Sequence, residues 1–186
     1  MHETGRIEYK IVQQILIDEG SQHFEELERA FGRVVGFRQI NEVSKKIFDT
    51  AVSDAVDRNV FIKNGDFLSI SENQPDQPSA QLRSRANLPQ ISRNFDYVPP
   101  AEIELAIYQI VEDAFSIHIM DIPPVVVQRL GFEHITQAVT HRLIGIVIDM
   151  LLNGRLALRQ EWITIPKYGT AQPDEDFYKQ FLTYLK

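Results

Sequence analysis

When the chain is shifted against itself by 95 positions, residues 7–70 align with residues 102–165 without a gap. Eleven of the 64 aligned positions are identical, and the apolar positions agree along the alignment. A repeat of this kind constrains the fold strongly, because both copies must form the same supersecondary unit. The sequence therefore predicts two related domains of about 65 residues each. The identical pairs are Gln14/Gln109, Ile15/Ile110, Asp18/Asp113, Ser21/Ser116, His23/His118, Gly36/Gly131, Phe37/Phe132, Ile40/Ile135, Val52/Val147, Asp54/Asp149 and Ile70/Ile165.

A polar segment joins the two predicted domains, and a tail follows the second. The segment is rich in Pro, Gln and Asn and has little apolar periodicity, which is typical of a linker. In the tail, the acidic run Asp174–Asp176 is typical of a helix start. The boundaries that we assign are 1–70 for the first domain, 71–98 for the linker, 99–168 for the second domain and 169–186 for the tail.

Within each copy the apolar spacing predicts three helices, and the β-rich runs that follow predict a two-stranded hairpin. Asn64-Gly65 marks the hairpin turn of the first copy. Three helices followed by a hairpin are the plan of a winged helix-turn-helix domain. We therefore expect a mainly α fold with small β-hairpins (α+β), formed by two tandem winged helix-turn-helix domains. The buried stripe expected on the third helix of the first copy is Ile40, Val43, Ile47, Ala51 and Ala55.

Residues at these turns, helices and wings resemble a known family. They are the run 97–107, Ile117-His118, Asp121-Ile122, Gly131-Phe132 and the run 151–156, with Ile15, Gly20, His23, Glu26-Leu27, Gly36-Phe37 and the run 65–68 in the first copy. In these positions the chain resembles the C-terminal winged-helix module of bacterial superfamily I DNA/RNA helicases, which often also carry a restriction-endonuclease-like nuclease domain. The resemblance implies two winged-helix folds and a helicase or nuclease partner in DNA processing or defence.

Composition and motifs argue against several other classes of protein. The chain has no Cys, which excludes disulfides, thiolate metal sites and a Cys nucleophile and fits a reducing cytoplasm. The longest nearly apolar run, residues 143–152, contains Asp149 and is far shorter than a bilayer span. No phosphate-binding Gly loop, nucleophile elbow or metalloprotease motif is present. We therefore expect a cytoplasmic, non-catalytic protein without metal, cofactor or membrane partner.

The five histidines do not change this expectation. His23 and His118 are repeat-equivalent and precede the second helix of their copies, where a turn or capping role is predicted. His134 and His141 are seven positions apart and have no third ligand at metal spacing.

The distribution of charge bears on nucleic-acid binding. The net charge of −7 divides into −4 for residues 1–72, +1 for 73–98 and −4 for 99–186, so both domains are acidic. In a winged helix that reads DNA, the start of the third helix enters the major groove and the wing contacts the backbone. In the first copy, the start of the third helix and the wing carry side chains that can bind DNA bases or phosphates. Acidic residues stand among them, so an ordinary solvent-exposed surface is the alternative interpretation. The candidate nucleic-acid-binding residues are Arg38, Gln39, Asn41, Lys45, Lys46 and Lys63.

In the second copy, the pattern of the third helix indicates an interaction surface rather than a nucleic-acid contact. Its residues Ile144, Ile148 and Leu152 align with the polar Asp49, Ser53 and Asp57 of the first copy, so the helix is apolar on nearly every side. A helix of that kind is normally buried on all sides, so another segment must pack over its apolar surface. One candidate is the tail, which would place Phe177, Phe181 and Leu185 over this helix within the chain or across a homodimer. The alternative is that the tail completes its own domain core.

Two functions of different class follow from the sequence. The first is a non-catalytic nucleic-acid-binding or regulatory accessory module linked to helicase and nuclease DNA processing or defence. The second is a protein–protein interaction or dimerisation module whose winged helices make no direct contact with DNA.

Overall fold

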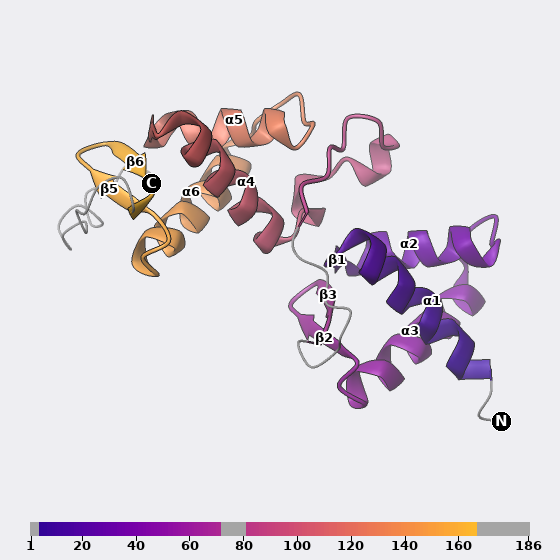
Figure 1. Ribbon diagram of the computed structural model, residues 1–186. Helices are drawn as coiled ribbons and strands as arrows, with labels where there is room; N and C mark the ends of the chain where they lie inside the picture. The colour runs from indigo at the N-terminus through magenta and orange to yellow at the C-terminus, as the bar shows by residue number, and fades with distance from the viewer. Residues whose placement is uncertain (1–3, 72–80, 167–186) are drawn as a thin grey trace. The chain divides into compact units, whose positions relative to one another are not determined.

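The computed structural model describes the backbone of residues 4–71 and 81–166 (Figure 1), with side chains from Glu8 onward. These residues divide into two compact units. Unit 1 extends to Gln81 and includes Asp96–Pro99, and unit 2 contains Leu82–Phe95 and the chain from Pro100 onward. The described part holds six α-helices and two small three-stranded antiparallel sheets, which confirms the predicted α+β class.

Unit 1 forms three helices and one sheet. The sheet has the strand order β1-β3-β2, so the strand before the second helix pairs with the hairpin. Sequence analysis predicted the hairpin and missed β1, whose two residues are too few to show a pattern. The elements are α1 (Thr4–Glu19), β1 (Gln22–His23), α2 (Phe24–Val35), α3 (Glu42–Asp57), β2 (Phe61–Asn64) and β3 (Phe67–Ile70).

Unit 2 repeats this order with additional short 3-10 helices. Its sheet has the order β4-β6-β5, which matches the sheet of unit 1 strand for strand. The elements are η1 (Gln90–Ser92), η2 (Phe95–Tyr97), α4 (Pro100–Ala114), β4 (Ser116–His118), η3 (Ile119–Asp121), α5 (Ile122–Arg129), α6 (Gln137–Leu152), β5 (Ala157–Arg159) and β6 (Trp162–Thr164). Of η2, Phe95 belongs to unit 2 and the other two residues belong to unit 1.

The structural repeat follows the same offset of 95 as the sequence repeat. The cross-strand pair Gln22–Leu68 of unit 1 corresponds to Ile117–Ile163 of unit 2, and the other shared pairs keep this register. The described residues with positive φ also match at this offset. They form the pairs Gly20/Phe115, Gly36/Gly131, Asn59/Gly154 and Gly65/Gln160.

The repeat-equivalent histidines have equivalent roles. His23 Nδ1 accepts a hydrogen bond from the amide of Glu25 (3.2 Å), and His118 Nδ1 accepts one from the amide of Met120 (3.3 Å). His23 caps helix α2, and His118 caps the 3-10 helix η3 that follows its strand. The predicted capping role is therefore confirmed for both residues.

The core of unit 1 forms where α1, α2 and α3 pack together around Phe48. The ring of Phe48 lies 5.0 Å from that of Phe24 and 5.5 Å from that of Phe31 between centroids. The predicted stripe is confirmed for Ala51 and Ala55, which are buried, and wrong for Val43 and Ile40. Phe48, with its larger aromatic ring, takes the fully buried position, and Ile47 packs against the same core only in part. Val43 is 66% exposed, and Ile40 precedes the helix.

The predicted linker is structured in its second half. We call residues 82–95 the strap, because they pack on unit 2 ahead of its first helix. Arg85, which is 5% exposed, donates from Nη1 and Nη2 to the two carboxylate oxygens of Glu102 at 2.8 and 2.7 Å. Arg83 adds bonds from its backbone amide (2.8 Å) and Nη2 (2.9 Å) to the same carboxylate.

The strap then crosses the turn between α5 and α6. The amide of Arg85 donates to the carbonyl of Leu130 at 2.9 Å. At Gly131 a Cβ would lie 2.6–2.8 Å from Ser84 Oγ and from the amide nitrogens of Arg85 and Ala86, so only glycine fits there. The strap segment is therefore part of the packing of unit 2.

We expect Glu102→Gln to lower the free energy of unfolding of unit 2 by about 3–5 kcal/mol, because it leaves the buried Arg85 without its counter-charge. Burial raises the pKa of Glu102, but the hydrogen bonds and charge of Arg85, together with Arg83, outweigh it and hold the pKa below 4.5. The stabilisation is therefore complete above pH 4.5 and is lost as the pH falls through the folded-state pKa.

Urea unfolding followed by the fluorescence of Trp162, the single tryptophan, measures this effect. Glu104→Gln is the matched control on the same helix, because Glu104 forms a more exposed ion pair with Arg155 and its loss is worth at most about 1 kcal/mol. Equal effects of the two substitutions at pH 7 would contradict the stabilising role of the Glu102 cluster.

A second pair of variants tests the close approach of the strap. Gly131→Ala and Gly36→Ala both place an alanine at positive φ, which costs about 1–2 kcal/mol. Only Gly131→Ala also forces the strap aside, because no atom of the described residues lies near the Cβ position of Gly36. For Gly131→Ala we therefore expect a further loss of about 1–3 kcal/mol. Urea unfolding, with hydrogen exchange to resolve unit 1, gives both values. Equal losses would show that the strap yields without cost.

Candidate interaction surface of unit 1

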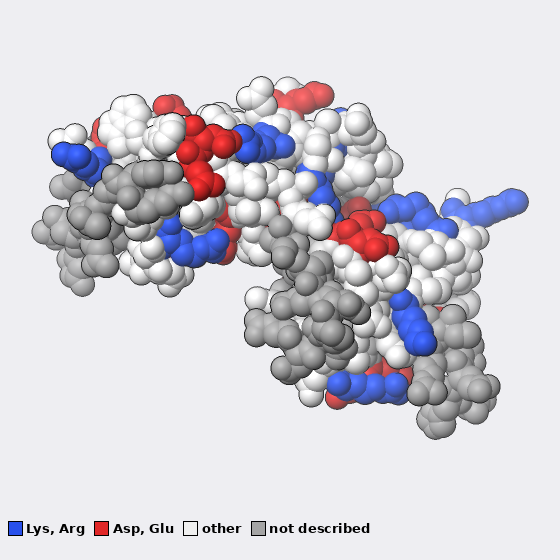
Figure 2. Space-filling view, in the orientation of Figure 1, with Lys and Arg blue, Asp and Glu red and all other residues white. Residues whose placement is uncertain are grey.

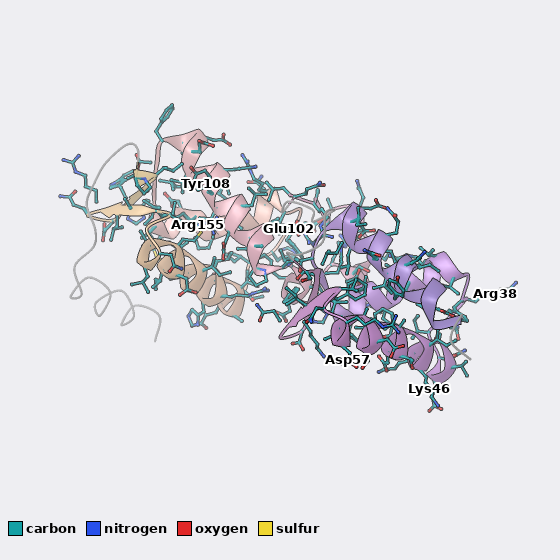
Figure 3. The ribbon with its side chains drawn as sticks, turned by 60° about the horizontal axis from the view of Figure 1, so that its bottom comes forward. Arg38, Lys46, Asp57, Glu102, Tyr108 and Arg155 are labelled. Atoms are coloured by element: carbon teal, nitrogen blue, oxygen red, sulfur yellow. The ribbon has the colours of Figure 1, made fainter. Side chains whose placement is uncertain are left out.

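The candidate nucleic-acid-binding residues of unit 1 are all exposed, and the exposed Glu42 stands between Asn41 and Lys45 in the chain. Arg38 and Lys46 point outward in Figure 3, and Gln39, Lys45 and Lys63 are also exposed. On the face shown in Figure 2, basic side chains lie among neutral and acidic residues. This pattern differs from the concentrated positive face that phosphate binding favours.

Asn41 is used for local structure. Its Oδ1 accepts hydrogen bonds from the amides of Val43 and Ser44 at 3.0 Å each. Ser44 Oγ accepts a bond from the amide of Asn41 at 2.8 Å, which completes a capping box at the start of α3. The carbonyl oxygen that a base contact would need is therefore already engaged.

Two of the lysines have partners on unit 1. The Nζ of Lys63 lies 5.1 Å from the ring centroid of Phe24, in cation–π geometry. Burial raises the pKa of Glu28, and the charge of the nearby Lys45 opposes this rise. Both cations thus have neighbours within the unit that compensate part of their charge.

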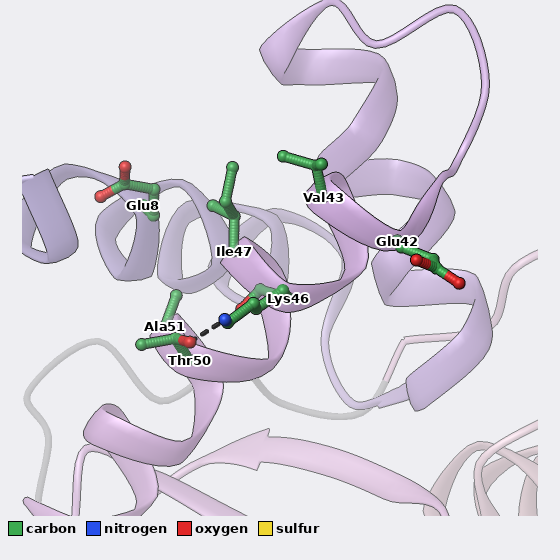
Figure 4. Close-up of a pocket in the computed structure, with 7 residues that line it drawn as sticks. All are labelled: Glu8, Glu42, Val43, Lys46, Ile47, Thr50 and Ala51. Carbon is green, nitrogen blue, oxygen red and sulfur yellow. Dashed lines mark hydrogen bonds between the residues drawn. The ribbon is translucent and has the colours of Figure 1, made fainter.

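An apolar hollow lies beside the same helix. It has a volume of about 500 Å³, and its apolar lining is Val43, Ile47 and Ala51 of α3. Figure 4 shows these side chains directed to the same side of α3, with Glu8 on the neighbouring helix α1. Oε2 of Glu8 is buried and has no hydrogen-bond partner within the described part of the chain.

The polar residues of the hollow carry mixed charge. Glu8 and Glu42 contribute two carboxylates, while Lys46 contributes one ammonium group. Thr50 donates from Oγ1 to the carbonyl of Lys46 at 2.8 Å. We call this site, lined by Glu8, Glu42, Val43, Lys46, Ile47, Thr50 and Ala51, the α3 hollow.

Sequence analysis placed Val43 and Ile47 in the core and so missed the hollow. A signal was present, because Ile47 and Phe48 are both apolar and adjacent on a helix, and one core cannot bury both fully. The apolar arc of α3 is therefore wider than its buried face.

The interaction residues predicted in unit 2 have unequal exposure. Ile144 has no exposed surface, so it belongs to the packed interior of the unit. Ile148 is half-buried, and Leu152, at the end of α6, is 63% exposed. Phe177, Phe181 and Leu185 of the tail lie outside the described residues.

Comparisons with known proteins do not identify this site. The chain matches no protein-family model, and the searches found no similar curated protein or solved structure. Within residues 4–71 and 81–166, no helix is both long and apolar enough to cross a membrane. In the same residues, His, Asp and Glu side chains form no group of three or more that could hold a metal ion.

Variants of Asn41 separate a capping role from a nucleic-acid contact. We expect Asn41→Ala to lower the free energy of unfolding of unit 1 by about 1 kcal/mol, because α3 loses its N-cap. Asn41→Asp keeps the cap and should leave stability nearly unchanged, while its charge would disrupt a base contact. Thermal unfolding followed by circular dichroism compares the two variants. A destabilisation by Asn41→Asp as large as that by Asn41→Ala would contradict the capping role.

Proposed function

We propose that this chain is a non-catalytic interaction module of two winged-helix units, and that the α3 surface of unit 1 binds a protein partner. The winged-helix assignment is supported by the order helix–strand–helix–helix–strand–strand, which both units follow. It is also supported by the sheet order, in which the first strand pairs with the last strand of the hairpin.

The observation that carries the proposal is the exposure of Val43 in the first turn of α3. Two-thirds of its surface is free at the place where a DNA-reading winged helix presents polar side chains to the major groove. Val43 also borders the α3 hollow, where Ile47 extends the apolar surface. Apolar side chains among alternating charges are suited to a protein interface, in which an apolar centre is surrounded by a polar rim.

The partner class rests on the sequence resemblance. The chain resembles a module of bacterial helicases that often also carry a nuclease domain, so we propose a helicase or nuclease component as the partner. A homodimer is the other arrangement, and the exposed Leu152 of α6 favours placing that contact on unit 2.

Nucleic-acid binding is the second candidate function. Its specific support is the exposure of Lys45 and Lys46 in the first turns of α3 and of Arg38 ahead of it. Arg38 and Lys46 point outward in Figure 3. Such contacts would be electrostatic and would weaken steeply with salt.

One pair of measurements on unit 1 separates the two functions. A photo-cross-linking residue at Val43, in the full chain expressed in its own host, should yield one discrete protein adduct. The same residue at Ser53, which is exposed further along α3, should not. With that partner purified, Val43→Glu should weaken binding at least tenfold, because a buried contact would become charged.

Fluorescence anisotropy with duplex and single-stranded DNA at several salt concentrations provides the opposing test. Salt-dependent binding that is lost in the double variant Lys45→Glu/Lys46→Glu, with no protein adduct at Val43, would reject the proposal in favour of nucleic-acid binding.

A further inference from the structure

In unit 2 the strap packs along the start of α4, the α5–α6 turn and α6. The repeat-equivalent surface of unit 1 carries exposed side chains. Arg85 of the strap binds Glu102 on α4, and the strap then crosses the α5–α6 turn at Gly131. It ends at Phe95, whose ring lies 5.2 Å from the ring of Phe132 between centroids. The carbonyl of Phe95 accepts a 2.7 Å hydrogen bond from Arg142 Nη1, so the aromatic residue is fastened to α6. Only 6% of Phe95 is exposed.

The repeat offset places the α3 hollow and the α2–α3 turn of unit 1 on the matching path. Gly36 is the counterpart of Gly131, but among the described residues no neighbouring atom lies within 4 Å of the position of its Cβ. Val35 is 40% exposed, whereas its counterpart Leu130 is fully buried. Ile47, the counterpart of Arg142, lines the hollow. The path is therefore occupied in unit 2 and free at these positions in unit 1.

The charges on the two paths are also related. In unit 2 a carboxylate in the first turn of α4, Glu102, receives the two strap arginines. In the sequence alignment its counterpart is Ile7, and the carboxylate of Glu8 stands one position later. Glu8 lines the α3 hollow, and its buried Oε2 lacks a donor within the described residues. A basic side chain would supply that donor.

We propose that unit 1 binds a short segment of a partner protein along this path, in the way that unit 2 holds its own strap. A large aromatic side chain of the partner enters the α3 hollow beside Ile47, and a basic side chain pairs with Glu8. The proposal rests on the proposed function, because it specifies which part of a protein partner the α3 surface receives.

A second copy of this chain is a poorer occupant than another protein. Its strap arginines are already held by its own Glu102, and the exchange would leave that buried carboxylate without partners. In the repeat alignment the position of Glu102 is taken by Ile7, which has no charge to pair with the arginines. We therefore assign the path to a different protein with an aromatic and a basic residue.

The probe for this proposal is a phage-displayed library of random 14-residue peptides, selected on the intact chain. We expect the enriched sequences to share an aromatic and a basic residue. The affinity of the enriched peptide, measured by fluorescence anisotropy, should fall at least tenfold in Val43→Glu and in Val35→Glu, which charge the hollow and the path. Glu8→Gln should reduce both the affinity and its dependence on salt.

The matched control is Ile91→Glu, because Ile91 is 69% exposed and Val43 is 66% exposed, so the same charge is introduced at similar exposure on unit 2. This variant should bind the peptide like the wild type. Absence of any enriched peptide, or binding that Val43→Glu and Val35→Glu leave unchanged, would overturn the segment proposal. If a folded partner still cross-links at Val43 in that case, the proposed function stands and only the segment mode fails.

Discussion

The buried ion pair between Arg85 and Glu102 determines how the strap packs on unit 2. Both side chains are nearly inaccessible to water, and a carboxylate in that position is tolerated only because two guanidinium groups and a backbone amide surround it. The pair fixes one end of the strap on the first turn of α4. From there the chain reaches the glycine turn at Gly131 and positions Phe95 against α6. The strap therefore depends on one electrostatic cluster.

The two units show what an internal repeat preserves and what it leaves free to change. The strand register, the positive-φ positions and the histidine caps are equivalent, because each satisfies backbone geometry or backbone hydrogen bonds. The outer surfaces of the third helices are not equivalent. Ile47 of unit 1 lines a hollow, whereas its counterpart Arg142 holds the strap. The candidate function therefore lies where backbone requirements place no demand on the side chain.

The start of α3 shows why residue type alone is a poor guide to function. Asn41 is suited to reading adenine, yet its carbonyl oxygen closes a capping box. Lys63 is suited to a phosphate contact, and it lies over the ring of Phe24. Val43 has the character of a core residue, and two-thirds of its surface is exposed. Each side chain is assigned its role by what packs beside it.

The sequence by itself determined the repeat, the α+β class, the hairpins and the capping histidines, because these depend on local spacing and backbone geometry. Only the tertiary structure decided three features: the strap, the full burial of Phe48 beside the half-buried Ile47, and the burial of Ile144. The strap sequence has the composition of a linker, and its Arg83 and Arg85 become structural only when Glu102, 17 residues or more away, is folded beside them. Helical periodicity identifies an apolar arc on α3, but the competition between neighbouring side chains for the same core sets which part of it is buried.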